Sequence, residues 1–328
     1  MINFDTGYTG AYPFFSSSEG HLFFNGEEIK NFVIPNSITS INPHAFYKCT
    51  GLEKITIPSS ITTIGEYAFY GCIGLEDIII PSSVEEVNSE VFNGCTNLTE
   101  VMIEDGETEL SLSFNDFSGR TNRLGKGLFY DCPIITLYIG RNLSYTDEMH
   151  CGYSPFYGIK TIKEVTLGNH VTKIENYLFG LCSGLESVTI PSSVTSIGNN
   201  VFQDCTSLTN LTIPYSVISI GNSVFSGCTG LTTLYSLNNI PPSIGTDNFS
   251  NNHYMTLNVY VPQEALTAYQ NAEIWKDLWN LQGFEYTGIE KVKANNQRED
   301  KYYDLRGNRL SAPKRGLNII NGKKVIMK

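Results

Sequence analysis

Cysteine is the residue type whose spacing in this chain could most readily support chemistry. Seven of the eight cysteines follow a phenylalanine by three residues, at Cys49, Cys72, Cys95, Cys132, Cys182, Cys205 and Cys228. Ile159 occupies the equivalent position after Phe156. A zinc site needs converging ligands such as paired CxxC motifs, and the sequence contains none. Because isoleucine can replace the thiol, we expect buried free thiols that act as small apolar groups.

The other residue types that often carry catalysis form no recognisable motif. The five histidines match no HExxH or HxH pattern, at His21, His44, His150, His170 and His253. There is no GxSxG elbow, phosphate-binding loop, GxGxxG motif or EF-hand spacing. His150 and Cys151 are adjacent, but neighbouring residues of a strand point to opposite faces. The sequence therefore predicts a protein without enzymatic activity, cofactor or metal site.

A 23-residue repeat accounts for the cysteine spacing. One phenylalanine anchors each copy, at Phe46, Phe69, Phe92, Phe129, Phe156, Phe179, Phe202 and Phe225, with Phe249 as a degenerate ninth. The spacing is 23 residues except in the middle of the chain, where it is 37 and then 27. A fixed period of this size indicates a solenoid of stacked repeats, which offers a long surface instead of a catalytic pocket.

Each repeat contains the parts of one turn of such a solenoid. In residues 52–74, the alternation over 55–57 predicts a strand, and Pro58 ends it. The segment 66–72 is expected to form one helical turn that buries Phe69 and Cys72 against neighbouring repeats. Stacked strands place Cα atoms about 4.8 Å apart, within the range for a disulfide. However, the Cα–Cβ bonds of stacked cysteines point in the same direction and not toward each other, so we expect free thiols and no disulfides.

Two recurrent segments, IPSSVTSIG at 190–198 and VFQDCTSLT at 201–209, resemble the BspA-like subfamily of bacterial leucine-rich repeat proteins. The resemblance covers about residues 18–286. It implies a β-rich leucine-rich repeat solenoid with a parallel sheet on one face, and with short helical turns and second short strands elsewhere. It also implies a surface protein that adheres to matrix proteins or to other cells.

The flanks of the array predict a division into segments. We expect an N-terminal cap or hairpin at 1–33, the solenoid at 34–236 with insertions at 105–120 and 141–151, a C-terminal cap with a helix at 237–286, a linker at 287–300 and a small β tail at 301–328. Because the flanking repeats supply the core, we expect deletion of 105–120 to leave the fold intact.

The tail has two possible roles. Its segments YDLRGNRL (303–310) and GLNIINGKKVIMK (316–328) resemble the tails of secreted Bacteroidetes proteins and a shortened sorting domain of type IX secretion. A simple β appendage explains them equally well.

Charge and hydropathy narrow the function classes. Residues 291–328 hold 11 Lys+Arg and 3 Asp+Glu, a net charge of +8, whereas residues 1–290 hold 11 and 30, a net charge of −19. An acidic body argues against nucleic-acid binding. No run of 18 apolar residues exists, so no membrane span is expected. The first residues do not have the pattern of a signal peptide, although a trimmed leader would leave the same start.

Two regions are candidates for ligand binding. The insertions combine aromatic and acidic residues that could engage a glycan, a basic peptide or Ca²⁺, or could have no role: Phe114, Phe117, Tyr145 and Tyr153 with Asp105, Glu107, Glu109, Asp116, Asp147 and Glu148. On the outward face of the predicted sheet, Ile79, Met102 and Tyr138 should form an exposed apolar run beside them.

These features favour a non-enzymatic, cell-surface or secreted binding protein that recognises a host matrix protein, a mucin or a cell-surface glycan, and we expect a monomer. Two alternatives remain open. The chain could be an intracellular or periplasmic scaffold for another bacterial protein, or an accessory protein that captures glycans.

Overall fold

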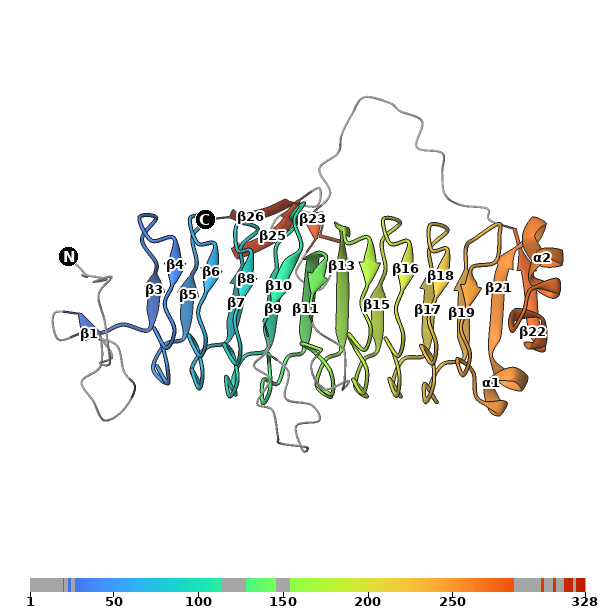
Figure 1. Ribbon diagram of the computed structural model, residues 1–328, viewed down its shortest axis with the longest axis horizontal. Coiled ribbons are helices and arrows are strands. Elements are labelled where there is room, and N and C mark those ends of the chain that lie inside the picture. The colour runs from blue at the N-terminus through green and yellow to red at the C-terminus, as the bar shows by residue number, and fades with distance from the viewer. Residues whose placement is uncertain are drawn as a thin grey trace, which may run out of the picture.

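The computed structural model describes residues 20, 23–24, 27–113, 128–145 and 154–285, and four short strands between residues 302 and 327. Successive repeats stack side by side along one long axis (Figure 1). The repeat solenoid predicted from the sequence is confirmed.

The first strands of the repeats lie along one side of the solenoid. They are β3 (Asn31–Val33), β5 (Lys54–Thr56), β7 (Asp77–Ile80), β9 (Glu100–Ile103), β11 (Thr136–Arg141), β13 (Glu164–His170), β15 (Ser187–Thr189), β17 (Asn210–Ile213), β19 (Thr233–Ser236), β21 (Asn258–Pro262) and β22 (Asn280–Phe284). Paired neighbours are parallel, with equivalent repeat positions opposite each other. Side chains alternate between core and outward face, so Ile55 is buried between exposed Lys54 and Thr56.

Short second strands form another parallel row. They are β4 (Ser40–Ile41), β6 (Thr63–Ile64), β8 (Glu86–Val87), β10 (Leu110–Leu112), β12 (Leu143–Ser144), β14 (Lys173–Ile174), β16 (Ser196–Ile197), β18 (Ser219–Ile220) and β20 (Ser243–Ile244). In most of them an isoleucine, leucine or valine is buried, so the core lies between this row and the first sheet.

A phenylalanine-centred turn closes each repeat and forms a third backbone ladder. The Phe46 N–H donates to the Ala68 carbonyl at 2.8 Å, and the Phe69 N–H donates to the Val91 carbonyl at 3.0 Å. The phenylalanine rings stack along the solenoid with centroids 5.1–6.4 Å apart. The expected helical turn is not formed, because positions such as Tyr67 (φ 56°) and Gly71 (φ 68°) have positive φ.

The cysteine side chains form a row of hydrogen bonds inside this turn. The Cys72 thiol donates to the Phe46 carbonyl at 2.9 Å, and the Cys95 thiol donates to the Phe69 carbonyl at 3.1 Å. The same contact to the preceding repeat recurs at Cys132, Cys182, Cys205 and Cys228. All seven described cysteines are buried and free, in agreement with the sequence. Burial raises the pKa of Cys182 and of Cys228 to about 12.

The strand pairing shows which residues of the two longer middle repeats are additional to the regular repeat. Ser111 of β10 pairs with Glu86 and with Ser144 of β12, so both strands are ordinary second strands. Leu110 and Leu112 are core residues. The range 105–120 is therefore not one dispensable loop, contrary to expectation. Most of the additional length falls in 114–127 and 146–153, outside the described residues.

The two ends of the array are built differently. At the N-terminal end, β1 (Phe23–Phe24) and β2 (Glu27–Glu28) pair antiparallel, as a hairpin around residues 25–26 requires. At the C-terminal end, the cap contains α1 (Asn251–Thr256), η2 (Gln263–Ala265), α2 (Leu266–Asn271) and η3 (Trp275–Asp277). Tyr269 and Trp275 are buried in it with ring centroids 5.1 Å apart. Trp279 does not join them, because it remains 74% exposed.

His253 of α1 ends the row of thiols. Its Nδ1 accepts a hydrogen bond from the Ser250 N–H, so the Nε2–H can donate to the Cys228 carbonyl 2.9 Å away. Burial lowers the pKa of His253, which favours this neutral form. The cap therefore contacts the last cysteine of the row through its backbone carbonyl, and does not repeat the thiol-to-phenylalanine contact.

The tail forms a separate antiparallel sheet in the order β24-β23-β25-β26. Its strands are β23 (Tyr302–Tyr303), β24 (Arg309–Leu310), β25 (Gly316–Ile320) and β26 (Lys323–Met327). The expected β tail is present in this sense, and its role in sorting remains a prediction.

Replacing Phe202 with Ala should lower the free energy of unfolding by about 3–5 kcal/mol, the usual cost of truncating a buried phenylalanine. Phe202 is fully buried, between Phe179 at 5.9 Å and Phe225 at 6.4 Å. Urea unfolding measures the change, with exposed Thr212→Ala as the control, for which we expect less than about 0.5 kcal/mol. A similar small loss for both variants would contradict the stacked core.

The buried thiols should make the protein less stable in alkali. Unfolded thiols ionise above their ordinary pKa of 9.0, whereas folded Cys182 and Cys228 remain protonated up to about 12. The free energy of unfolding should therefore fall as the pH rises from 9 toward 12. Urea unfolding under reducing conditions at several pH values measures the slope. A Cys182→Ala/Cys228→Ala variant should have a shallower slope, and equal slopes would refute the explanation.

Candidate functional site

Two strands in the middle of the first sheet, β11 and β13, are longer than their neighbours, and glycine follows their core residues where several other repeats have proline. Gly140 and Gly168 occupy the position held by Pro81 and Pro191 in other repeats. β11 and β13 extend to Arg141 and His170. Glycine is required by close packing, since a Cβ at Gly140 would collide with the backbone of Asp105.

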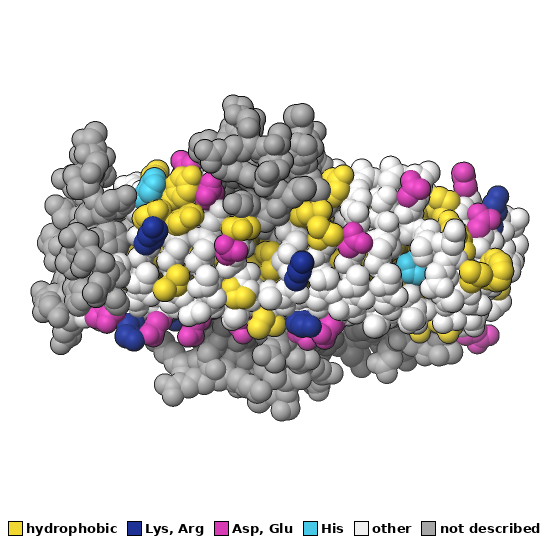
Figure 2. Space-filling view, turned by 90° about the horizontal axis from the view of Figure 1, so that it is seen from below, with side chains coloured by type: hydrophobic (Ala, Val, Ile, Leu, Met, Phe, Trp, Pro, Cys, Tyr) yellow, Lys and Arg dark blue, Asp and Glu magenta, His cyan; other side chains and the backbone are white. Residues whose placement is uncertain are grey.

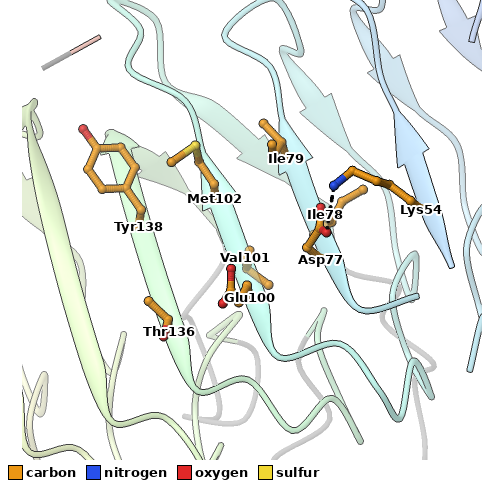
Figure 3. A pocket seen from close by; sticks show the side chains of 9 residues that line it. All are labelled: Lys54, Asp77, Ile78, Ile79, Glu100, Val101, Met102, Thr136 and Tyr138. Atoms are coloured by element: carbon orange, nitrogen blue, oxygen red, sulfur yellow. Dashed lines mark hydrogen bonds and ion pairs between the residues drawn. The ribbon is translucent and has the colours of Figure 1, made fainter. Parts of the chain in front are cut away.

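A pocket of about 220 Å³ lies on the outward face of this sheet, across β5, β7, β9 and β11 (Figure 3). The described residues that line it are Lys54, Asp77, Ile78, Ile79, Glu100, Val101, Met102, Thr136 and Tyr138. Two parallel rows of outward side chains define its character. The polar row contains Lys54, Asp77, Glu100 and Thr136, and the apolar row contains Ile79, Met102 and Tyr138 (Figure 3).

The apolar row lies where the sequence places it but is less exposed than expected. The register sets Ile79 beside Met102, and Met102 beside Tyr138. Met102 is only 4% exposed and Tyr138 only 7%, so the predicted exposed apolar run is not observed at these two positions. Neither residue belongs to the core cluster. The row is therefore a recessed wall of the outward face.

The polar row carries uncompensated negative charge. Lys54 Nζ lies 3.3 Å from Asp77 Oδ2, which forms one exposed ion pair. Glu100 forms no ion pair with the described residues, and the buried Oε2 of Glu164 has no hydrogen-bond partner. The register places Thr136 directly between Glu100 and Glu164. Sequence reasoning missed this pair, although the repeat pattern assigned both glutamates to the outward face.

Tyr138 connects the pocket to a polar cluster at the end of β11. Its Oη donates to Asp105 Oδ1 at 2.8 Å. Burial raises the pKa of Tyr138, and the neighbouring Asp105 carboxylate raises it further. Burial also raises the pKa of Asp105, which the hydrogen bond from Tyr138 partly opposes. This hydrogen bond fixes the orientation of the Tyr138 ring.

The other acidic residues of this region are paired within the chain. Glu107 Oε1 lies 3.3 Å from His170 Nδ1, and Glu109 Oε1 lies 2.9 Å from Lys173 Nζ. Tyr145 is half-buried, and its Oη donates to the Asn176 carbonyl at 2.8 Å. The two ion pairs connect the β9–β10 repeat with the β13–β14 repeat across the one between them, and Tyr145 joins adjacent repeats. None of these side chains lines the pocket.

Arg141 was not anticipated from the sequence. Its side chain is fully buried, with Nη1 donating to the Ser82 carbonyl and Nη2 to the Pro81 carbonyl, each at 3.0 Å. Burial lowers its pKa, whereas the charge of Glu104 acts in the opposite direction. It therefore ties β11 to the turn that follows β7. The signal that could have revealed it is the replacement of Pro-Ser by Gly-Arg at 140–141.

Several predicted site residues cannot be placed. Phe114, Phe117, Asp116, Asp147, Glu148 and Tyr153 lie outside the described residues. Within the part of the chain that the structure describes, no three or more His, Cys, Asp or Glu side chains are grouped so that they could bind a metal ion. No helix in that part has the length and hydrophobicity of a transmembrane span.

Figure 2 shows the solenoid surface that faces downward in Figure 1, and the residues described on this surface form no counterpart of the two rows at the pocket. On its described part, apolar, acidic and basic side chains are scattered among uncharged polar atoms (Figure 2). They form no broad hydrophobic patch there. The recessed pocket on the outward sheet face is thus the more specific candidate for a binding site.

Comparisons with known proteins agree with this architecture. The family model described as the BspA type leucine rich repeat region, with six copies, matches residues 19–149 and 149–272. No curated protein matches the chain.

Solved structures of bacterial leucine-rich repeat proteins are similar to the chain. A leucine-rich repeat protein from Bacteroides ovatus is 25% identical, with a TM-score of 0.43 over 70% of this chain and 63% of its own. A leucine rich cell surface protein from Faecalibacterium prausnitzii is 22% identical, with a TM-score of 0.41 over 74% and 65%. The matched part of the chain thus corresponds to less than two thirds of each relative.

Replacing Tyr138 with Phe should lower the free energy of unfolding by about 1–3 kcal/mol, because Asp105 would lose a hydrogen bond in a half-buried position. Tyr235→Phe on β19 is the matched control, since Tyr235 is an outward tyrosine whose hydroxyl has no hydrogen bond within the described residues. Urea unfolding compares the two variants. Equal stability of both would show that the Tyr138–Asp105 contact contributes nothing measurable.

Proposed function

Because the chain belongs to the BspA-type leucine-rich repeat family, we propose that it is a non-enzymatic, cell-surface or secreted binding protein. It recognises a macromolecular ligand through the outward face of the first sheet and the loops of the middle repeats. The ligand classes are a host matrix protein, a mucin or a cell-surface glycan.

The pocket across β5 to β11 is the observation that supports this proposal. A solenoid presents a rigid surface on which equivalent positions of successive repeats form rows. Here one row is apolar and recessed. The adjacent polar row contains Glu100, which forms no ion pair with the described residues, and Glu164 lies next to its Thr136 end. A macromolecule laid across the strands could contact both rows at once.

The acidic charge of the body supports a non-nucleic-acid ligand. Residues 1–290 carry a net charge of −19, which repels the phosphate backbone. The same charge favours ligands with basic or neutral surfaces.

Binding of the purified chain to immobilised matrix proteins, mucins and glycans at two salt concentrations tests the proposal. We expect saturable binding to at least one ligand. Met102→Lys should weaken that binding at least tenfold, because the added charged side chain fills the pocket. Thr212→Lys is the matched control, since Thr212 is an exposed outward position on β17, and its binding should be unchanged.

Two further variants separate the contributions of the loops and the tail. Phe114→Ser/Phe117→Ser/Tyr153→Ser keeps the chain length and tests the loop residues. Neutralising Lys314, Arg315, Lys323 and Lys324 tests non-specific attraction by the basic tail. Binding that disappears only in the tail variant and at high salt would contradict the proposed site. If no ligand binds saturably, the intracellular or periplasmic scaffold is favoured. A pull-down of another bacterial protein with the purified chain would then test that alternative.

A further inference from the structure

The charge balance of the pocket points to a cationic ligand group. Lys54 compensates Asp77 at one end of the pocket (Figure 3). Glu100 lines the other end of the pocket, and Glu164 lies just beside the lining residues, on the far side of Thr136. Neither glutamate forms an ion pair with the described residues, and the buried Oε2 of Glu164 has no hydrogen-bond partner. Lys54 lies on β5, three strands from Thr136, so about 14 Å separates its strand from that end. The ammonium group of Lys54 pairs with Asp77 and forms no ion pair with Glu100 or Glu164.

The apolar row beside these carboxylates suits the stem of a long cationic side chain. Met102 and Tyr138 are outward residues two positions beyond Glu100 and Thr136 on the same strands, which is about 6.6 Å along the strand. Lysine and arginine place their methylene groups on apolar surface while the charged end contacts polar groups. The Tyr138 ring also provides a face for a cation–π contact.

Arginine fits this arrangement better than lysine. Its planar guanidinium presents five N–H donors, so it can bond two carboxylates and stack on an aromatic ring at the same time. The Thr136 hydroxyl lies between the two glutamates in the register and can accept a further hydrogen bond. A neutral sugar would leave both carboxylates uncompensated.

We propose that this pocket binds an arginine side chain from a basic, extended segment of a partner protein. The guanidinium lies over Thr136 between Glu100 and Glu164, and its stem lies along Met102 and Tyr138. This inference rests on the proposed function and specifies the ligand class of the same site. The net charge of −19 on residues 1–290 would attract such a segment over longer distances.

An NMR titration of the full chain with a short peptide tests the proposal directly. The probe is acetyl-Gly-Leu-Arg-Leu-Gly-amide, and its control replaces arginine with citrulline, which is neutral and nearly isosteric. The chain contains only five methionines, so methyl-labelled methionine gives a simple spectrum in which Met102→Leu assigns the reporter signal. We expect the Met102 signal to shift saturably with the arginine peptide and not with the citrulline peptide.

Charge-neutralising variants locate the interaction. Glu100→Gln/Glu164→Gln should weaken binding of the arginine peptide at least tenfold, because both carboxylates are removed without a change of shape. Glu264→Gln/Glu273→Gln removes the same charge from two exposed positions of the C-terminal cap and should leave the affinity unchanged. Equal affinity in both double variants would overturn the proposal. The citrulline comparison needs no variant, so it decides the question even if one double variant does not fold.

Two other occupants would be recognised by the same set of measurements. A zero-length crosslink in the full chain between Glu100 or Glu164 and a lysine of 291–328 would assign the pocket to the chain's own basic tail and overturn the proposal. Equal shifts with both peptides would indicate an apolar ligand and also overturn it. If Met102→Lys abolishes binding to a matrix protein or glycan but the arginine peptide does not bind, only the arginine assignment fails and the proposed function stands.

Discussion

The stacking of one repeat on the next in a fixed register is the constraint on which the whole structure depends. Three backbone ladders impose it, through the first strands, the second strands and the phenylalanine-centred turns. A repeat cannot shift along its neighbour without breaking all three. Each core residue therefore meets its own equivalent in the adjacent repeats, and rows of phenylalanine rings and cysteine thiols run through the core.

The same constraint creates the candidate binding surface. Because equivalent positions of adjacent repeats lie side by side, residues that differ from the repeat pattern at the same position in successive repeats become neighbours on the surface. Outward residues of β7, β9 and β11 thus form an apolar row, and the polar residues two positions earlier, Asp77, Glu100 and Thr136, form a parallel one. Gly140 and Gly168 replace proline at this place, and a Cβ at either position would collide with Asp105, which accepts the Tyr138 hydrogen bond. These departures from the repeat lie beside Tyr138, which lines the pocket.

The sequence predicted the parts of the fold that the repeat period governs. The period identified the solenoid, and the position of the cysteines, with Ile159 in one of their places, indicated small buried groups. The phenylalanine turn was harder to predict. Its residues resemble a short helix in composition, yet hydrogen bonds to the next repeat require positive φ at positions such as Tyr67 and Gly71. Hydrogen-bond acceptors in the next repeat determine that backbone conformation, so the conformational preferences of the turn residues alone do not reveal it.

Sequence by itself determined the repeat register, the inward and outward rows, and the charge of the body and the tail. Tertiary structure decided which outward residues are recessed and which charges are compensated. Met102 and Tyr138 have the same strand positions as exposed threonines, but their exposure depends on the surrounding surface. Glu100 and Glu164 are separated by 64 positions in the chain and become neighbours of Thr136 only through stacking. Burial and charge pairing depend on the arrangement of several repeats at once, and a pattern within one repeat does not contain that information.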